Sequence, residues 1–318
     1  MFDKLIEILK ANPRKIVFTE GPDARILEAS ARLKKDGFLT PVLVGKVDEV
    51  KAAAAKGGFD IEGLEILDPE TYPEMDAMVD KMVELRKGKM TPEQCRDALK
   101  KGNYFGTMLV KMGKADSLLG GATYSTADTV RPALQLIKTK PGNKIVSSCF
   151  ILARGDELIA MGDCAINIHP GEDDLVEIAQ ETANCAKTFG IDPKVAFLSF
   201  STKGSAKDDE ITMVQNAVAK AKAVMDVPVD GEMQFDAAVA PEVGQLKFPG
   251  SSVAGHANTF IFPNVTAGNI GYKIAQRLGG FAAYGPILLG LNAPINDLSR
   301  GCVADEVYKM AIITAALA

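Results

Sequence analysis

The chain has 318 residues, of which 47% are hydrophobic and 24% are charged, and its formal net charge is −5. These proportions are typical of a globular protein and argue against disorder, while the length predicts two domains of ordinary size. The acidic balance argues against a nucleic-acid-binding surface, but it leaves room for a local basic pocket that holds a phosphorylated ligand.

Neither the N-terminus nor the cysteines indicate export or a metal. Residues 1–10 predict an amphipathic helix, because Asp3 and Glu7 interrupt the apolar run that a signal peptide needs. No stretch offers ~18 uninterrupted apolar residues, so we expect no membrane span. The five cysteines form no C-x-x-C pair and there are two histidines, which predicts reduced thiols in a cytoplasmic protein and no metal site.

Short β-branched runs alternate with helical patterns in the first half of the chain. Residues 15–18 predict a strand, a helical pattern follows until Gly37, and residues 41–45 predict a second strand. Together these elements make a βαβ unit. Residues 72–112 are rich in charge and methionine and predict helices, and a further strand is expected at residues 117–121.

The turn at residues 140–143 is the candidate domain boundary, because a Pro-Gly pair interrupts the pattern there. Beyond it, the patterns predict strands at residues 144–152, 158–161, 165–168 and 195–200, a helix at 175–188, and a buried strand broken by turns at 281–291. Repeated alternation of this kind predicts α/β layers with mostly parallel strands.

Four polar segments follow predicted strands, where the active sites of open α/β sheets collect. In the first, residues 122–131, the hydroxyls of Ser125 and Thr126 and the start of the next helix could hold a phosphate, with Arg131 as a charged clamp. A capped helix start explains the same residues equally well, because Ser, Thr and Asp are favoured there for structural reasons.

The second segment is a loop after the strand predicted at residues 195–200. It consists of Ser201, Thr202, Lys203, Gly204 and Ser205. It lacks the Gly-Lys-Ser/Thr ending of a P-loop, which argues against ATP hydrolysis. An anion-binding loop and an ordinary helix cap remain equally open for it.

The third segment, residues 263–277, combines a sharp turn with the start of a helix. Its candidate binding residues are Asn264, Asn269, Tyr272, Lys273 and Arg277. A tight turn with solvated basic residues would explain them, but the density of small polar groups favours a ligand site.

The fourth segment ends in a Ser299-Arg300-Gly301 turn that leads into a predicted helix. A hydroxyl, a guanidinium and free backbone N–H groups are what the stabilisation of a developing oxyanion requires. Asp305 and Glu306 lie in the first turn of that helix, where acids are also favoured by the helix dipole. An ordinary cap explains these acids, but it gives no reason for the whole run Asn-Asp-Leu-Ser-Arg-Gly at residues 296–301.

Other reactive side chains carry weaker signals. His169 and His256 lack a nearby nucleophile motif such as G-x-S-x-G, and His256 is interpreted as structural. Cys164 is interpreted as a small buried residue. The acidic run at residues 208–210 predicts a solvated helix start rather than a metal site.

These segments resemble signatures of the phosphate acetyltransferase family. Residues 18–29 look like its N-terminal signature, and residues 122–132, 201–206, 262–273 and 296–301 look like its other signatures in the same order. The resemblance spans nearly the whole chain. It implies two α/β/α domains flanking a cleft, in the fold of isocitrate and isopropylmalate dehydrogenases, and a homodimer. The expected domains are residues 1–142, joined by the C-terminal segment 294–318, and residues 143–293.

The resemblance also implies an activity and roles for individual residues. The activity is reversible exchange between acetyl-CoA plus phosphate and acetyl phosphate plus CoA, in a ternary complex without an acyl-enzyme and without a tightly bound cofactor. Ser299 and Arg300 match the catalytic Ser-Arg pair of the family. Arg86 and Arg131 match arginines tied to CoA binding, and Arg277 matches another active-site arginine.

The general base is a departure from the family pattern. The family has an aspartate seven residues after the serine, and this register falls on Glu306, with Asp305 beside it. Neighbours on a helix point about 100° apart, so only one of the two carboxylates should face the thiol. The register favours Glu306, while a small backbone shift would bring Asp305 into place.

Three other functions are weighed against this one. A phosphate butyryltransferase differs only in an acyl pocket that the sequence does not locate. A metal- and nicotinamide-dependent decarboxylating dehydrogenase shares the implied fold, but the chain lacks a G-x-G-x-x-G fingerprint and an aspartate cluster. A non-catalytic binding protein on the same scaffold would be expected to lose the Ser299–Arg300 pair, which is present.

Overall fold

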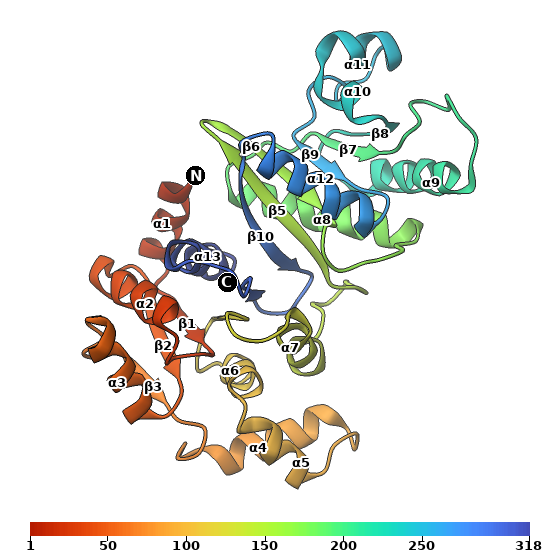
Figure 1. The fold of residues 1–318 in the computed structure, drawn as a ribbon. Helices are drawn as coiled ribbons and strands as arrows, with labels where there is room; N and C mark the ends of the chain where they lie inside the picture. The colour runs from red at the N-terminus through yellow and green to blue at the C-terminus, as the bar shows by residue number, and fades with distance from the viewer. The chain divides into compact units, whose positions relative to one another are not determined.

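Two units, each with its own β-sheet, make up the computed structural model, which describes all 318 residues (Figure 1). Unit 1 comprises Met1–Pro141 together with Leu291–Ala318, and unit 2 comprises Gly142–Gly290. None of the helices combines the length and the apolar character that crossing a membrane requires.

Unit 1 contains a five-stranded parallel sheet in the order β11-β4-β1-β2-β3. The strands are β1 (Lys15–Phe18), β2 (Thr40–Val44), β3 (Glu65–Leu67), β4 (Ser117–Gly120) and β11 (Ile295–Asp297). Ile16, Val17 and Phe18 are all fully buried, as expected for a parallel strand that is covered on both faces. Strand β11 comes from the C-terminal segment and pairs with β4, so the end of the chain completes the sheet built by its beginning.

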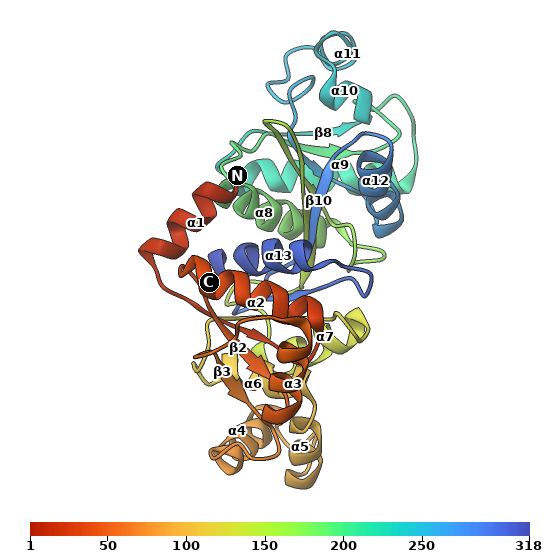
Figure 2. The same ribbon diagram turned by 60° about the vertical axis from the view of Figure 1, so that its left-hand side comes forward.

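Helices cover both faces of this sheet (Figures 1 and 2). One face carries α1 (Phe2–Ala11), α2 (Ala24–Asp36), α3 (Val47–Gly57) and α13 (Ala304–Ala316). The other carries α4 (Met75–Arg86), α5 (Pro92–Leu99), α6 (Gly102–Lys111) and α7 (Thr126–Pro132), which runs into a π-helical turn, η1 (Ala133–Ile137). The predicted end of α2 is confirmed, because Gly37 has a φ of +74°, a left-handed conformation that glycine adopts most easily.

Unit 2 contains a six-stranded mixed sheet in the order β10-β5-β6-β9-β7-β8. The strands are β5 (Ser147–Arg154), β6 (Glu157–Gly162), β7 (Val195–Leu198), β8 (Val229–Met233), β9 (Thr259–Ile261) and β10 (Ala282–Leu289). Strand β5 is antiparallel to both β6 and β10, whereas the other pairs are parallel. The prediction of mostly parallel strands therefore holds for unit 1 and for only part of unit 2.

The helices of unit 2 also lie on both faces of its sheet. α8 (Glu172–Thr188) and α9 (Asp209–Val224) cover one face, where they share a core with the buried β7 side chains Val195 and Phe197. The opposite face packs against α10 (Phe235–Val239), α11 (Pro241–Lys247) and α12 (Val265–Arg277). The predicted helix start at residues 208–210 is confirmed, because the Asp208 carboxylate accepts a hydrogen bond from the Glu210 N–H and caps α9.

One predicted strand is wrong and another is shorter than expected. Residues 165–168 form a loop, because the N–H groups of Ala165, Ile166 and Asn167 donate to the Asp163 carboxylate and not to a neighbouring strand. The strand predicted from residue 144 begins at residue 147, since the N–H groups at residues 144 and 145 donate to the Glu177 carboxylate. In both places a side chain accepts the hydrogen bonds that a strand would have given to the sheet.

Candidate active site

The carboxyl ends of three neighbouring strands, β1, β4 and β11, meet at one edge of the unit 1 sheet. Because these strands are parallel, the loops that follow them also meet there. The loops comprise residues 19–23, 121–125 and 298–303. This edge therefore gathers the N-terminal signature, the first polar segment and the Ser-Arg turn.

The Ser299–Arg300 turn is a short, exposed loop between β11 and α13. The Ser299 carbonyl accepts a hydrogen bond from the Cys302 N–H at 2.9 Å, and the Ser299 hydroxyl oxygen accepts one from the Gly301 N–H at 3.2 Å. Cys302 is buried and anchors the far end of the turn. The Arg300 guanidinium forms no hydrogen bond or ion pair within unit 1, so it is available to an anion.

A buried carboxylate, Asp297, lies directly before this turn. Its two oxygens accept hydrogen bonds from the hydroxyls of Thr126 and Thr129, each at 2.5 Å. Burial raises the pKa of Asp297, and the two hydroxyl bonds oppose that rise. The Thr126 hydroxyl, for which the sequence left a phosphate site and a helix cap equally open, therefore joins α7 to the end of β11.

A second carboxylate, Glu20, organises the loop after β4. It accepts hydrogen bonds from the N–H groups of Gly121, Ala122 and Thr123, at 3.0, 3.2 and 2.5 Å, and from the Thr123 hydroxyl at 2.7 Å. The Ser125 hydroxyl donates to Asp128 at 2.7 Å. These five donors thus have internal acceptors, which restrains the shape of the loop.

The two candidate bases differ in their surroundings. The Asp305 carboxylate forms ion pairs with Lys309 at 2.7 Å and with Arg32 of α2 at 3.1 Å. The hydrogen bond from Lys309 is the main cause that lowers the pKa of Asp305, which makes it a weaker base. The exposed Glu306 carboxylate has a single described partner, the Val303 N–H at 3.1 Å, in a capping arrangement.

The two arginines matched to CoA binding lie near one tyrosine. Burial raises the pKa of Tyr104, and the nearby charges of Arg131 and Arg86 oppose that rise. The Tyr104 hydroxyl donates to Gln135 at 3.0 Å. Arg131 is exposed and only loosely paired, 3.9 Å from Asp128, and the Arg86 Nε is buried without an acceptor. The ends of α4 and α7 thus bring two arginines close to Tyr104, with Asp128 beside Arg131.

In unit 2, the loop after β7 closes around a buried carboxylate, Glu232 of β8. The Glu232 carboxylate accepts hydrogen bonds from the Ser201 hydroxyl at 2.8 Å and from the Gly204 N–H at 2.7 Å. The Thr202 N–H donates to the Ser205 hydroxyl oxygen at 3.0 Å. Lys203 has a left-handed φ of +51°, and its exposed ammonium lies 5.0 Å from the centre of the Phe248 ring.

The start of α12 carries the third segment. Asn264 caps the helix through the Ala267 N–H at 3.0 Å and donates to Glu210 at 2.9 Å. Asn269 accepts a hydrogen bond from Lys273 at 2.9 Å and donates to the Cys164 carbonyl at 3.2 Å. The Tyr272 ring stacks on Phe150, with the ring centres 3.9 Å apart. The cationic ends of Lys273 and Arg277 are exposed.

The predicted site residues thus fall into two sets, one in each unit. Unit 1 holds Ser125, Thr126, Arg86, Arg131, Ser299, Arg300, Asp305 and Glu306. Unit 2 holds Ser201, Thr202, Lys203, Gly204, Ser205, Asn264, Asn269, Tyr272, Lys273 and Arg277. Sequence reasoning missed the carboxylates that shape these loops, Glu20, Asp297 and Glu232. For Glu20 and Asp297 a signal existed, since each is an acid at the end of a buried strand.

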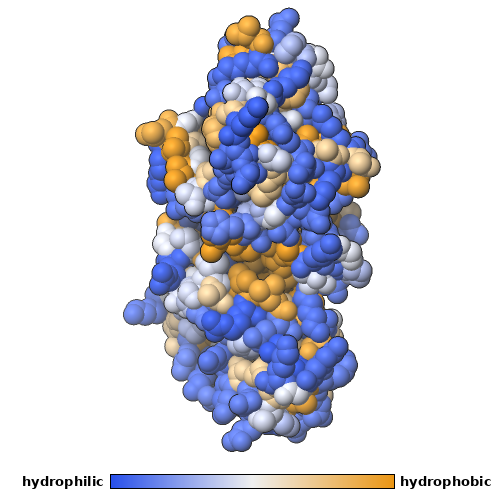
Figure 3. Space-filling view, turned by 90° about the vertical axis from the view of Figure 1, so that its right-hand side faces the viewer, coloured by the Kyte–Doolittle hydropathy of each residue, from blue (hydrophilic) through white to orange (hydrophobic).

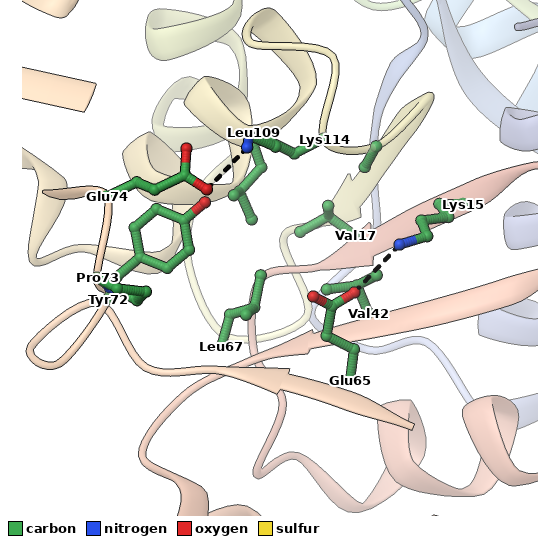
Figure 4. Close-up of a pocket in the computed structure, with 11 residues that line it drawn as sticks. Lys15, Val17, Val42, Glu65, Leu67, Tyr72, Pro73, Glu74, Leu109 and Lys114 are labelled. Atoms are coloured by element: carbon green, nitrogen blue, oxygen red, sulfur yellow. Dashed lines mark hydrogen bonds and ion pairs between the residues drawn. The ribbon is translucent and has the colours of Figure 1, made fainter. Parts of the chain in front are cut away.

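A hollow of ≈ 290 Å³ in unit 1 is separate from the candidate site (Figure 4). Side chains of β1, β2 and β3 line it together with Leu109 of α6, so it lies against the face of the sheet that α6 covers. Lys15 pairs with Glu65 at 3.3 Å, and Lys114 pairs with Glu74 at 2.8 Å. Its charges are thus neutralised internally, and none of the predicted site residues lines it.

Comparisons with known proteins agree with the resemblance. A model of the phosphate acetyl/butaryl transferase family matches residues 1–315. The phosphate acetyltransferase of Bacillus subtilis (strain 168) is 56% identical over 320 aligned positions, which cover 100% of this chain and 99% of that protein. The crystal structure of a phosphotransacetylase from Streptococcus pyogenes is 52% identical, with a TM-score of 0.97, over 99% of this chain and 97% of that one.

A more distant structure bears on the fold alone. A 4-hydroxythreonine-4-phosphate dehydrogenase from Burkholderia phymatum has 12% identity and a TM-score of 0.52, over 96% of this chain and 98% of that one. This likeness confirms the predicted α/β fold related to dehydrogenases. From the family match and the identity to a full-length relative, we conclude that the chain belongs to the phosphate acetyl/butaryl transferase family.

Proposed function

We propose that this chain is a phosphate acetyltransferase, which moves an acetyl group reversibly between coenzyme A and inorganic phosphate. The observation that carries the proposal is the exposed Ser299–Arg300 turn, whose guanidinium has no partner within unit 1. The 56% identity to the Bacillus subtilis phosphate acetyltransferase supports the acetyl substrate.

The substrates of the proposed reaction, CoA, acetyl phosphate and phosphate, are all anionic. Arg86 and Arg131 bind CoA through its phosphates, and the proximity of both arginines to Tyr104 supports a shared role. Ser125 and Thr126 belong to the same proposed set as acceptors for N–H and O–H groups of CoA, because their own hydroxyl protons are donated to Asp128 and Asp297. The proposed contacts from unit 2 are Ser201, Thr202, Lys203, Gly204, Ser205, Asn264, Asn269, Tyr272, Lys273 and Arg277.

The proposed chemistry is a direct transfer in a ternary complex. Glu306 takes the proton of the CoA thiol, and the thiolate attacks the carbonyl carbon of acetyl phosphate. The new C–S bond replaces the C–O bond to phosphate, which leaves paired with Arg300, while the Ser299 hydroxyl donates a hydrogen bond at the reacting centre. No acyl-enzyme, metal or bound cofactor is needed.

Two effects supply most of the expected rate enhancement. Holding thiol and acetyl phosphate in line contributes ~7–11 kcal/mol of barrier lowering in favourable cases. By analogy with an oxyanion-hole donor, Arg300 contributes on the order of 10²–10³-fold in rate. Phosphate is a good leaving group once its charge is neutralised, so a covalent enzyme intermediate offers no advantage.

The acyl substrate is tested by comparing acetyl-CoA, propionyl-CoA and butyryl-CoA in a phosphate-dependent assay of thiol release. Acetyl-CoA is expected to give the highest kcat/KM. A preference for butyryl-CoA would support a phosphate butyryltransferase, the second activity that the family name covers. Reduction of NAD by a 2-hydroxy acid in the presence of the protein would instead support the dehydrogenase alternative.

The proposal includes a homodimer that works in the cytoplasm, in acetate metabolism. Helix α12 exposes Ile270 and Ile274 on one side, four residues apart, and Leu278, which directly follows the helix, is exposed as well. Such an exposed apolar stripe supports burial against a second copy. Exposed apolar side chains also occur on α10 and α11, namely Phe235, Val239 and Leu246. Hydrophobic residues are visible at the top of the molecule in Figure 3.

A further inference from the structure

Arg25 lies at the start of α2, two residues after Asp23, which caps the helix. The Asp23 carboxylate accepts hydrogen bonds from the Arg25 backbone N–H at 2.9 Å, from its Nε at 2.9 Å and from its Nη2 at 2.8 Å. The side-chain bond from Arg25 is the main cause that lowers the pKa of Asp23. This two-point contact fixes the plane of the guanidinium as well as its position.

The rest of the guanidinium contacts the two loops next to it. Its Nη2 donates to the Ala122 carbonyl at 2.8 Å, in the loop after β4. Its Nη1 donates to the Arg300 carbonyl at 2.8 Å and to the Cys302 carbonyl at 3.2 Å, in the turn after β11. All five N–H groups of this guanidinium therefore have an acceptor, and one side chain joins the loops after β1, β4 and β11.

We propose that Arg25 is a positioning residue for the transfer reaction, which holds the backbone of Arg300 so that the Arg300 guanidinium meets the phosphate. This inference rests on the proposed function of the Ser299–Arg300 turn. That turn is exposed, and its own hydrogen bonds run only from Gly301 and Cys302 back to Ser299. The hydrogen bond from Arg25 joins the Arg300 carbonyl to the rest of unit 1.

Lysine cannot replace arginine in this role. An ammonium donates from one point, so it cannot bind both oxygens of Asp23 and also reach the carbonyls of Ala122 and Arg300. Arg25→Lys keeps the charge and the apolar stem but frees the turn. Asp23→Asn is a second test, because asparagine still caps the helix while the ionic anchor of the guanidinium is lost.

Arg14→Lys is the matched control for Arg25→Lys. Arg14 also lies in unit 1, where it donates to the Ala318 carbonyl at 2.9 Å and pairs with Asp116 at 3.4 Å. It directly precedes β1, at the amino end of the sheet, so it has no link to the Ser299–Arg300 turn. Its loss should affect stability alone.

The experiment measures kcat, the KM for phosphate and the KM for acetyl-CoA, at a temperature where circular dichroism shows each variant folded. Arg25→Lys and Asp23→Asn are expected to lower kcat, by up to the order of 10²-fold for Arg25→Lys, because small misplacements of reacting groups carry such costs. The KM for phosphate should rise and that for acetyl-CoA should not change. Arg14→Lys should leave all three constants unchanged.

Two outcomes separate the inference from the function on which it rests. If Arg300→Ala loses turnover while Arg25→Lys and Asp23→Asn keep kcat and the phosphate KM within about twofold, the positioning role of Arg25 is overturned. The same holds if Arg25→Lys changes both KM values equally, since that would mean a general loss of structure. If Arg300→Ala itself keeps its turnover, the proposed function fails.

Discussion

At the scale of single residues, the candidate site depends on how its acids are paired. Asp305 is held by Lys309 and Arg32, so its proton affinity is reduced. Glu306 accepts one hydrogen bond from the backbone at the start of its own helix. A carboxylate with one exchangeable partner can turn to a thiol at a smaller cost than one held by two cations, which supports Glu306 as the base.

Exchanging the two acids one at a time tests this assignment. Glu306→Gln should lower kcat by on the order of 10²–10⁴-fold, the usual contribution of a general base, whereas Asp305→Asn should have little effect on rate. Steady-state kinetics of thiol acetylation by acetyl phosphate measures both. Loss of rate in Asp305→Asn alone would assign the base to Asp305.

The buried Asp297 makes stability depend on pH in a direction that can be worked out. Its pKa is raised in the folded state, so folding favours the protonated form. The wild type should therefore lose stability relative to Asp297→Asn as the pH rises from the ordinary aspartate pKa of about 4 through the higher folded value. Urea unfolding of both proteins between those values measures the difference. A difference that stays constant or grows in favour of the wild type would contradict the raised pKa.

At the scale of elements, periodicity predicted strands correctly where no side chain accepts the backbone N–H groups of the segment. The run Ile16-Val17-Phe18 shows this, because a parallel strand covered on both faces must be apolar throughout. The strand predicted at residues 165–168 failed because Asp163 accepts the N–H groups of that segment. A local sequence pattern does not show which carboxylate accepts the backbone N–H groups of a nearby loop.

The loop after β7 offers a test at this scale. Glu232→Ala would leave the Ser201 hydroxyl and the Gly204 N–H without their buried acceptor, so it should destabilise unit 2 by ~1–3 kcal/mol. Glu157→Ala in the same unit is the control, because its exposed pair with Arg154 should contribute only ~0–1 kcal/mol. Chemical denaturation compares the two variants. Equal effects would mean that Glu232 does not hold the loop.

At the scale of the whole molecule, the C-terminal segment of the chain joins the same unit as the N-terminal segment. Strand β11 pairs with β4, and α13 packs against α1 and α2, so the C-terminal segment belongs to unit 1. This arrangement brings Ser299 and Arg300 beside the loops that carry Glu20 and Ala122. The sequence alone marked each loop as polar, but strand order is a property of topology, so the resemblance to a family was needed to group them.

The most direct test of the central proposal is the release of CoA thiol from acetyl-CoA by the purified protein, with and without inorganic phosphate, for wild type and Arg300→Ala. Wild type should release thiol only when phosphate is present. Arg300→Ala should lose on the order of 10²–10³-fold in kcat, while its unfolding transition stays unchanged because this guanidinium has no partner in unit 1. Near-normal turnover by Arg300→Ala, or thiol release that does not depend on phosphate, would contradict the proposed function.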